Sequence, residues 1–151
     1  MKRVDISTLV SDRDSTEMYE LLSETERFPQ LTDAIESLRI ERGTDTTAVS
    51  TWRVRFRNGI LQWTEADVYD PELRTIAFDQ VDGDFDSFRG TWSVEPGEHG
   101  CVVRFIAEFD FGMPTLAPMV DPIAEAALCE NVAQIVSGLA AAPRRALRGH
   151  S

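Results

Sequence analysis

The stretch that decides the fold is residues 47–70, TAVSTWRVRFRNGILQWTEADVYD. Apolar and polar residues alternate along both halves of this stretch, which is typical of β-strands with one buried face. Asn58-Gly59 in the middle is the dipeptide favoured in a two-residue type I′ turn, where both central residues need positive φ. The stretch therefore predicts a β-hairpin.

A loop at residues 58–59 predicts the pairing of the two strands. It places Arg57 opposite Ile60 and Ser50 opposite Asp67. Because successive side chains of a strand point to opposite faces, this register also assigns the faces of the hairpin. The apolar face, expected to be the inner one, contains Ser50, Trp52, Val54, Phe56, Leu61, Trp63, Glu65, Asp67 and Tyr69. The inner face therefore includes two carboxylates.

Further strands and two short helices surround the hairpin in the sequence. Alternation predicts strands at residues 4–10, 35–42, 74–81, 85–94 and 101–110, in addition to the two strands of the hairpin. Capping residues at 11–15, and Ser23 with Glu26 as a capping box, predict two short helices after the first strand. Seven strands in succession with short turns predict an antiparallel meander.

The last element is a long amphipathic helix from Pro122 to about Leu139. Its apolar stripe consists of Val120, Ala124, Leu128, Val132, Ile135 and Leu139. A sheet with one apolar face and a helix with an apolar stripe bury these surfaces against each other. We therefore predict an α+β fold in which a seven-stranded, curved antiparallel sheet wraps around the C-terminal helix. We expect residues 1–151 to form a single domain, with a cavity between sheet and helix.

Composition excludes several classes of function. The net charge is −11, which disfavours nucleic acid and anionic membranes as partners. No apolar run approaches the roughly 20 residues that a membrane helix needs. Met1 to Asp5 turn acidic before any apolar signal-peptide core, so we expect a cytoplasmic protein.

The few lysine, histidine and cysteine residues also exclude several kinds of catalytic chemistry. Lys2 is the only lysine, His99 lies in a turn-like segment, and His150 is next to the last residue. Schiff-base chemistry, catalytic triads and zinc sites are therefore not expected. Cys101 and Cys129 are isolated and make no disulfide framework. We expect no cofactor and no metal, and a site built from carboxylates, hydroxyls, aromatic rings and shape.

Local motifs within this order of elements carry a resemblance to a known family. They are Phe28-Pro29-Gln30-Leu31, residues 61–65 (LQWTE), Asp70-Pro71 with Arg74-Thr75, Phe85, Trp92 and residues 104–110 (RFIAEFD). Over roughly residues 3–140 the chain resembles the helix-grip fold of the START-like (SRPBCC) superfamily. Within it, the chain is most similar to the single-domain aromatase/cyclases of bacterial aromatic polyketide synthases, which act in antibiotic biosynthesis.

The resemblance implies a ligand cavity and a polyketide intermediate as substrate. Phe28 and Trp63 stand at the family's aromatic pocket positions. The family's cavity tyrosine falls at Ile35, its arginine at Asp67 and its glutamine at Ala107. Three polar pocket positions therefore differ in this chain.

Glu65 and Asp67 are the candidate catalytic residues. Cyclisation of a polyketide needs a proton removed from a carbon between carbonyls, an aldol addition and loss of water. An apolar pocket raises the pKa of a carboxyl, and two neighbouring carboxyls can divide into one ionised and one protonated group. The alternatives are that both are ordinary surface acids at the far end of the hairpin, or that they pair with an arginine.

The aromatic residues are candidates to form a slot for a flat ligand, or simply the core. The candidate substrate-binding residues are Phe28, Ile35, Trp52, Trp63, Tyr69, Phe88, Trp92, Phe105, Ala107, Phe109 and Asn131. Asn131 interrupts the apolar part of the long helix and either bonds a ligand carbonyl or faces solvent. Arg53, Arg55 and Arg57 form a basic row for an acidic acyl carrier protein, or pair with acids on neighbouring strands.

Three hypotheses for function follow. The first is a cofactor-independent polyketide cyclase, aromatase or dehydratase. The second is a non-catalytic binding protein for a hydrophobic metabolite such as a lipid, a quinone or a natural product. Carboxyls buried at the cavity favour the enzyme, and a purely apolar cavity favours the binder. The third is an adaptor with an exposed apolar patch and no cavity. The sequence allows a monomer or a homodimer.

Overall fold

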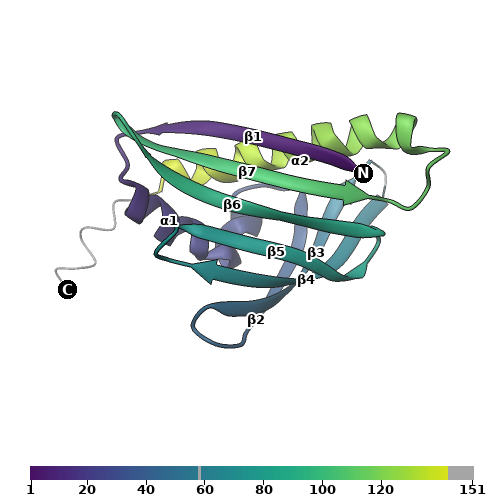
Figure 1. The fold of residues 1–151 in the computed structure, drawn as a ribbon, viewed down its shortest axis with the longest axis horizontal. Coiled ribbons are helices and arrows are strands. Elements are labelled where there is room, and N and C mark those ends of the chain that lie inside the picture. The colour runs from purple at the N-terminus through teal and green to yellow at the C-terminus, as the bar shows by residue number, and fades with distance from the viewer. Residues whose placement is uncertain (58, 143–151) are drawn as a thin grey trace.

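The computed structural model describes residues 1–57 and 59–142 (Figure 1). The elements are β1 (Lys2–Ser11), α1 (Ser15–Ser23), the 3₁₀ helix η1 (Thr25–Gln30), β2 (Ile35–Arg42), β3 (Thr47–Phe56), β4 (Gly59–Asp70), β5 (Thr75–Gly83), β6 (Ser87–Gly97), β7 (Gly100–Asp110) and α2 (Ala117–Ala140). The order of predicted elements is confirmed.

The strands form one seven-stranded antiparallel sheet in the order β1-β7-β6-β5-β4-β3-β2. Figure 1 shows the sheet curving, with α2 lying along it beside β1. The apolar inner face of the sheet and the apolar side of α2 enclose the core between them. This arrangement confirms the predicted helix-grip fold.

The two short helices begin differently. Asp14 caps α1, because its carboxylate accepts hydrogen bonds from the backbone N–H groups of Thr16 (3.1 Å) and Glu17 (3.3 Å). The predicted capping box of the second helix is wrong. The Ser23 hydroxyl instead donates back to the carbonyl of Tyr19 at 2.8 Å, and η1 begins after Glu24 without a side-chain cap.

The predicted register of the central hairpin is wrong by two residues, but its faces are correct. The ladder ends with Phe56 opposite Gly59, and Ser50 lies opposite Glu65 rather than Asp67. The loop starts earlier because Arg57 adopts a positive φ of 58°; position 58 lies outside the described residues. A shift by two preserves the faces, since the side-chain period of a strand is two.

The long helix α2 starts at Ala117, five positions before the predicted start at Pro122. Pro118 fits the first turn, where its missing N–H would have had no partner, and Pro122 lies inside the helix. At the other end, the buried guanidinium of Arg13 donates to the carbonyls of Ala140 (3.0 Å) and Ala142. No helix in the described part of the chain is long and apolar enough to cross a membrane.

Candidate functional site

A cavity of about 80 Å³ lies between the inner face of the sheet and α2. Its lining residues are Ile35, Trp52, Val54, Arg55, Phe56, Leu61, Trp63, Glu65, Phe78, Phe85, Phe88, Trp92, Phe105, Ala124, Ala127, Leu128, Asn131, Val132 and Ile135. Glu65, Asn131 and Arg55 are the polar members of this lining. Drug-sized ligands occupy pockets of roughly 300–1,000 Å³, so this cavity has to enlarge before it can hold a multi-ring ligand.

The cavity opens between the tip of the central hairpin, residues 31–34 and α2. Arg55 and Ala127 line both the cavity and two surface grooves that flank this opening. The Arg55 guanidinium donates to the carbonyl of Asp33. The Thr32 hydroxyl donates to the side-chain oxygen of Gln134, which fastens the 31–34 segment to α2.

Two stacked tryptophans form the wall next to the polar part of the cavity. Trp52 and Trp63 are cross-strand partners with ring centroids 5.7 Å apart and planes at 7°. The Trp52 Nε1–H donates to Ser50 Oγ at 2.9 Å, and the Trp63 Nε1–H donates to Glu65 Oε1 at 2.8 Å. Donor and acceptor are two residues apart in each case, so the pleat places them on the same face.

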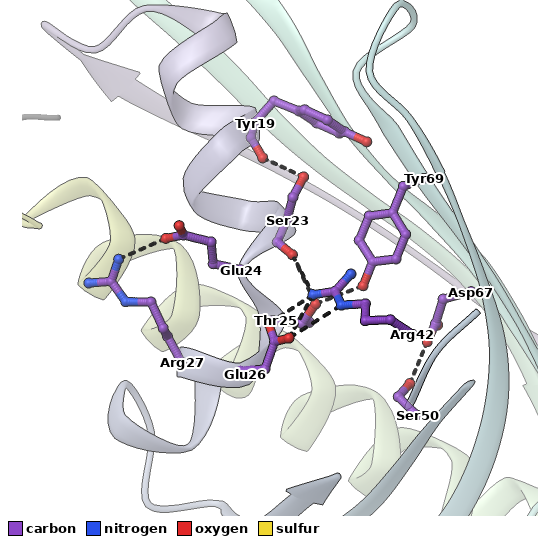
Figure 2. Close-up of polar contacts among 10 residues, drawn as sticks. All are labelled: Tyr19, Ser23, Glu24, Thr25, Glu26, Arg27, Arg42, Ser50, Asp67 and Tyr69. Carbon is purple, nitrogen blue, oxygen red and sulfur yellow. Dashed lines mark hydrogen bonds and ion pairs between the residues drawn. The ribbon is translucent and has the colours of Figure 1, made fainter. Parts of the chain in front are cut away.

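Glu65 and Asp67 are both buried, with 5% and 4% of their surface exposed. The Ser50 hydroxyl donates to Asp67 Oδ2 at 2.5 Å (Figure 2). Among the described residues, neither carboxyl has an arginine or lysine within ion-pair distance. The interpretations as surface acids and as arginine partners are therefore wrong. Glu65 lines the cavity and Asp67 lies behind it.

The surroundings change the proton affinity of both groups. Burial raises the pKa of Glu65 well above its ordinary value, and hydrogen bonding and repulsion by Asp67 raise it further, against smaller lowering effects of the Trp63 N–H and the Ser50 hydroxyl. Burial also raises the pKa of Asp67, opposed by hydrogen bonds from Glu65 and Ser50 and by the charge of Arg42. The pair therefore retains a proton more strongly than isolated carboxyls do.

A second polar cluster lies beside Asp67 (Figure 2). The Arg42 Nη2 contacts both carboxylate oxygens of Glu26, at 2.8 and 2.9 Å, and the guanidinium lies 5.0 Å from the ring centre of Tyr69. The Tyr69 hydroxyl bonds the Thr25 hydroxyl at 2.8 Å. Tyr69 thus connects the sheet to η1 and does not line the cavity.

The structure brings together seven of the predicted substrate-binding residues in the cavity lining. These are Ile35, Trp52, Trp63, Phe88, Trp92, Phe105 and Asn131. The other four are Phe28, Tyr69, Ala107 and Phe109, which are buried outside that lining. Phe28 packs edge-on behind Trp52 and Trp92, with ring centroids 6.2 and 6.0 Å away. That all eleven residues contact substrate stays a prediction.

Sequence reasoning missed several members of the lining. Phe78 alternates with Ile76 on β5, so period two contained the signal. Phe85, expected at the start of a strand at 85–94, lies in the turn before β6, so the alternation of that strand does not assign its side chain to a face. Arg55 lies on the outward face of β3 by alternation, so the pattern gave no signal that it also belongs to the cavity lining.

A curved antiparallel sheet around a long C-terminal helix, with an apolar cavity between them, defines a START-like helix-grip protein. Residues 12–136 match the family described as "Polyketide cyclase / dehydrase and lipid transport", and the chain belongs to this family. No curated protein sequence is significantly similar to it. Within the described residues, no group of His, Cys, Asp and Glu side chains is arranged to hold a metal ion.

Solved structures share the fold at low sequence identity. TTHA0849 from Thermus thermophilus is 22% identical with a TM-score of 0.83, over 99% of this chain and 100% of that one. The Zhui aromatase/cyclase from Streptomyces sp. R1128 is 15% identical with a TM-score of 0.78, over 99% and 98%. A START superfamily protein from Mycobacterium smegmatis is 18% identical with a TM-score of 0.74, over 90% and 94%.

Proposed function

We propose that this protein is a polyketide cyclase, aromatase or dehydratase that holds a polyketide intermediate in the cavity. The observation that carries the proposal is the Glu65 carboxyl, which lines an otherwise mostly aromatic and aliphatic cavity. Family membership and the shared fold of the Zhui aromatase/cyclase support it.

In the proposed mechanism Glu65 is the catalytic residue. As a carboxylic acid it donates its proton to a ketone oxygen while a new carbon–carbon bond forms, and as a carboxylate it takes a proton from the carbon between two carbonyls. In dehydration the acid protonates the departing hydroxyl, and the carboxylate then accepts the proton from the neighbouring carbon. Asp67 lies behind Glu65 and acts through it, as a positioning residue.

The remaining lining residues orient the substrate. The flat faces of Trp52, Trp63 and Trp92 favour a planar ligand. Asn131 lines both the cavity and the groove at its opening, and its amide can donate to a ligand carbonyl. Substrate therefore enters between α2 and the hairpin.

We also propose an acyl carrier protein as the source of substrate, in the cytoplasm of a bacterium that makes an aromatic natural product. Arg53 is occupied, because it donates to Glu36 at 2.8 Å and to Gln62 at 2.5 Å. Arg55 and Arg57 are exposed beside the cavity opening, where they offer positive charge on a protein of net charge −11. Docking of an acidic carrier protein there places a tethered chain next to the opening.

The test is co-expression with a minimal aromatic polyketide synthase and comparison of the products. We expect a cyclised or dehydrated product with the wild-type protein, and its loss with Glu65→Gln. The matched control is Glu41→Gln, which makes the same change at an exposed strand position. An identical product profile with and without the wild-type protein would count against the enzyme.

The second candidate is a binding protein for a hydrophobic metabolite. It is favoured by the apolar side chain of Ile35, a lining position where the resembling cyclases have a polar pocket residue. Native mass spectrometry of the protein purified from its source would distinguish the two. A stoichiometric ligand that is released chemically unmodified supports the binding protein, provided that the polyketide products are the same with and without the protein.

A further inference from the structure

The hydrogen bonds around the carboxyl pair have a fixed direction. An indole N–H can only donate, so Ser50 Oγ is the acceptor of the 2.9 Å bond from Trp52. The hydroxyl has one hydrogen, which remains free to donate. Asp67 Oδ2, at 2.5 Å, receives it.

Glu65 has different surroundings from Asp67. The Trp63 N–H occupies Oε1 of Glu65 at 2.8 Å, which leaves the other oxygen available to the cavity and to Asp67. The positive charge of Arg42 acts on the Asp67 side of the pair. A negative charge is therefore better accommodated on Asp67, and a proton is better accommodated on Glu65.

We propose that Ser50 is a positioning residue that, oriented by Trp52, directs its hydrogen to Asp67 and keeps the proton of the pair on Glu65. The carboxylic acid then faces the ligand, and its conjugate base lies behind it. The use of this proton in catalysis rests on the proposed function, whereas its location does not.

This arrangement specifies the class of group that binds next to Glu65. A carboxylic acid O–H donates to a neutral oxygen, such as a ketone carbonyl or a hydroxyl. A ligand carboxylate at this place would lie beside the negative charge of Asp67 and is disfavoured. The inner end of the ligand is therefore a neutral ketone or alcohol.

Other charged groups around the pair are few in the described residues. They are Tyr69 on β4, Arg42 on β2, Glu26 on η1 and Arg55 at the opening. On β5 the partner of Glu65 is the uncharged Gln80, and α2 contributes Asn131 and apolar residues to the cavity. Asp67 is thus the titrating neighbour that decides where the proton resides.

The test is a carbon-13 NMR titration of the side-chain carboxyls of Glu and Asp, assigned with Glu65→Gln and Asp67→Asn. Over the pH range in which the pair holds one proton, we expect the larger share on Glu65 in the wild-type protein. Ser50→Ala should move part of this share to Asp67, because the ionised Asp67 loses its donor. Ser50→Thr, which keeps the hydroxyl, should leave the distribution as in the wild type.

Two further variants keep the experiment decisive. Trp52→Phe removes the N–H that orients Ser50 and should shift the proton in the same direction, even if Ser50→Ala does not fold. Ser37→Ala, at an exposed position of β2, is the control and should change nothing. A proton that resides mainly on Asp67 in the wild type, or a Ser50→Ala titration identical to the wild type, overturns the proposal. The NMR titration contains no substrate. Its result therefore stands even if the polyketide assay shows no activity.

Discussion

At the residue scale, the account depends on where two neighbouring acids point. Alternation along residues 60–69 placed Glu65 and Asp67 on the inner face, and both are buried. That only Glu65 lines the cavity could not be predicted. Asp67 instead accepts the hydrogen bond of Ser50 one step further along β4, and the β4–β5 register shifts between Thr64 and Glu65, leaving Val81 unpaired and exposed. A single sequence gives no signal for such a bulge.

The raised pKa of Glu65 predicts how stability depends on pH. A group whose pKa is higher in the folded than in the unfolded protein binds extra protons on folding. The contribution of such a group to the free energy of unfolding is complete below its pKa in the unfolded protein. It is lost as the pH rises through its pKa in the folded protein. The wild-type free energy of unfolding should therefore fall over that interval.

Glu65→Gln should weaken this decline, because glutamine stays neutral and still accepts from Trp63. Above the folded pKa of Glu65 the variant should be more stable than the wild type, by about 1–3 kcal/mol for an avoided buried charge. Urea denaturation at a series of pH values measures both proteins. Parallel pH profiles would contradict the assignment of a raised pKa to Glu65.

At the element scale, the periodicities predicted strands and helices well and their ends poorly. The strand at 35–42 agrees with β2, whereas α2 begins five residues before its prediction at Pro122. Proline early in a helix is compatible with either a start or an interior position, so the sequence alone cannot decide.

The close packing of β6 against β7 depends on Gly90, where a Cβ would lie 2.2 Å from the carbonyl oxygen of Ile106.

Gly90→Ala should therefore destabilise the sheet at its centre. The added methyl also meets the ring of Phe78 at 2.8 Å, and that ring lines the cavity. We expect a loss of about 1–3 kcal/mol, as for other overpacked cores, measured by chemical denaturation. Gly97→Ala is the control, since its nearest contact is an ordinary 3.5 Å. Equal stability of the two variants would contradict the close approach at Gly90.

Arg13 joins the N-terminal segment to the end of α2. Arg13→Met should remove the donors to the carbonyls of Ala140 and Ala142 while keeping an apolar stem. Hydrogen bonds from charged groups contribute about 1.5–3 kcal/mol, so a loss of this size is expected. Hydrogen exchange should accelerate in the last turn of α2 and leave the central strands unchanged. Unaltered exchange in that turn would show that Arg13 does not hold it.

At the scale of the whole molecule, the fold was predictable and the size and opening of the cavity were not. Both depend on side chains from β2 to β7 and α2 that meet only in the folded protein. All three tryptophans line the cavity, which makes intrinsic fluorescence a direct reporter of ligand entry. Ala127 lines the cavity and both grooves at its opening, whereas its neighbour Ala126 lines one of these grooves and not the cavity.

A bulky residue at the opening should block binding. We expect 2-naphthol, a flat neutral probe, to quench the tryptophan fluorescence of the wild type and of Ala126→Phe. With Ala127→Phe the affinity should fall at least about tenfold, which corresponds to roughly 1.4 kcal/mol. If both phenylalanine variants bind the probe equally, the entrance is not where the cavity meets these grooves.

The catalytic role proposed for Glu65 is tested by the rate of ring closure or dehydration by the purified protein as a function of pH. The substrate is the intermediate released by a minimal polyketide synthase, and the comparison is wild type against Glu65→Gln. For dehydration, which starts from the carboxylic acid form of Glu65, the wild-type rate should fall as the pH rises through the folded pKa of Glu65. The account predicts a variant slower by about 10²–10⁴, the usual contribution of general acid–base catalysis, and without that pH dependence. A Glu65→Gln protein with the wild-type rate and pH profile would contradict the account.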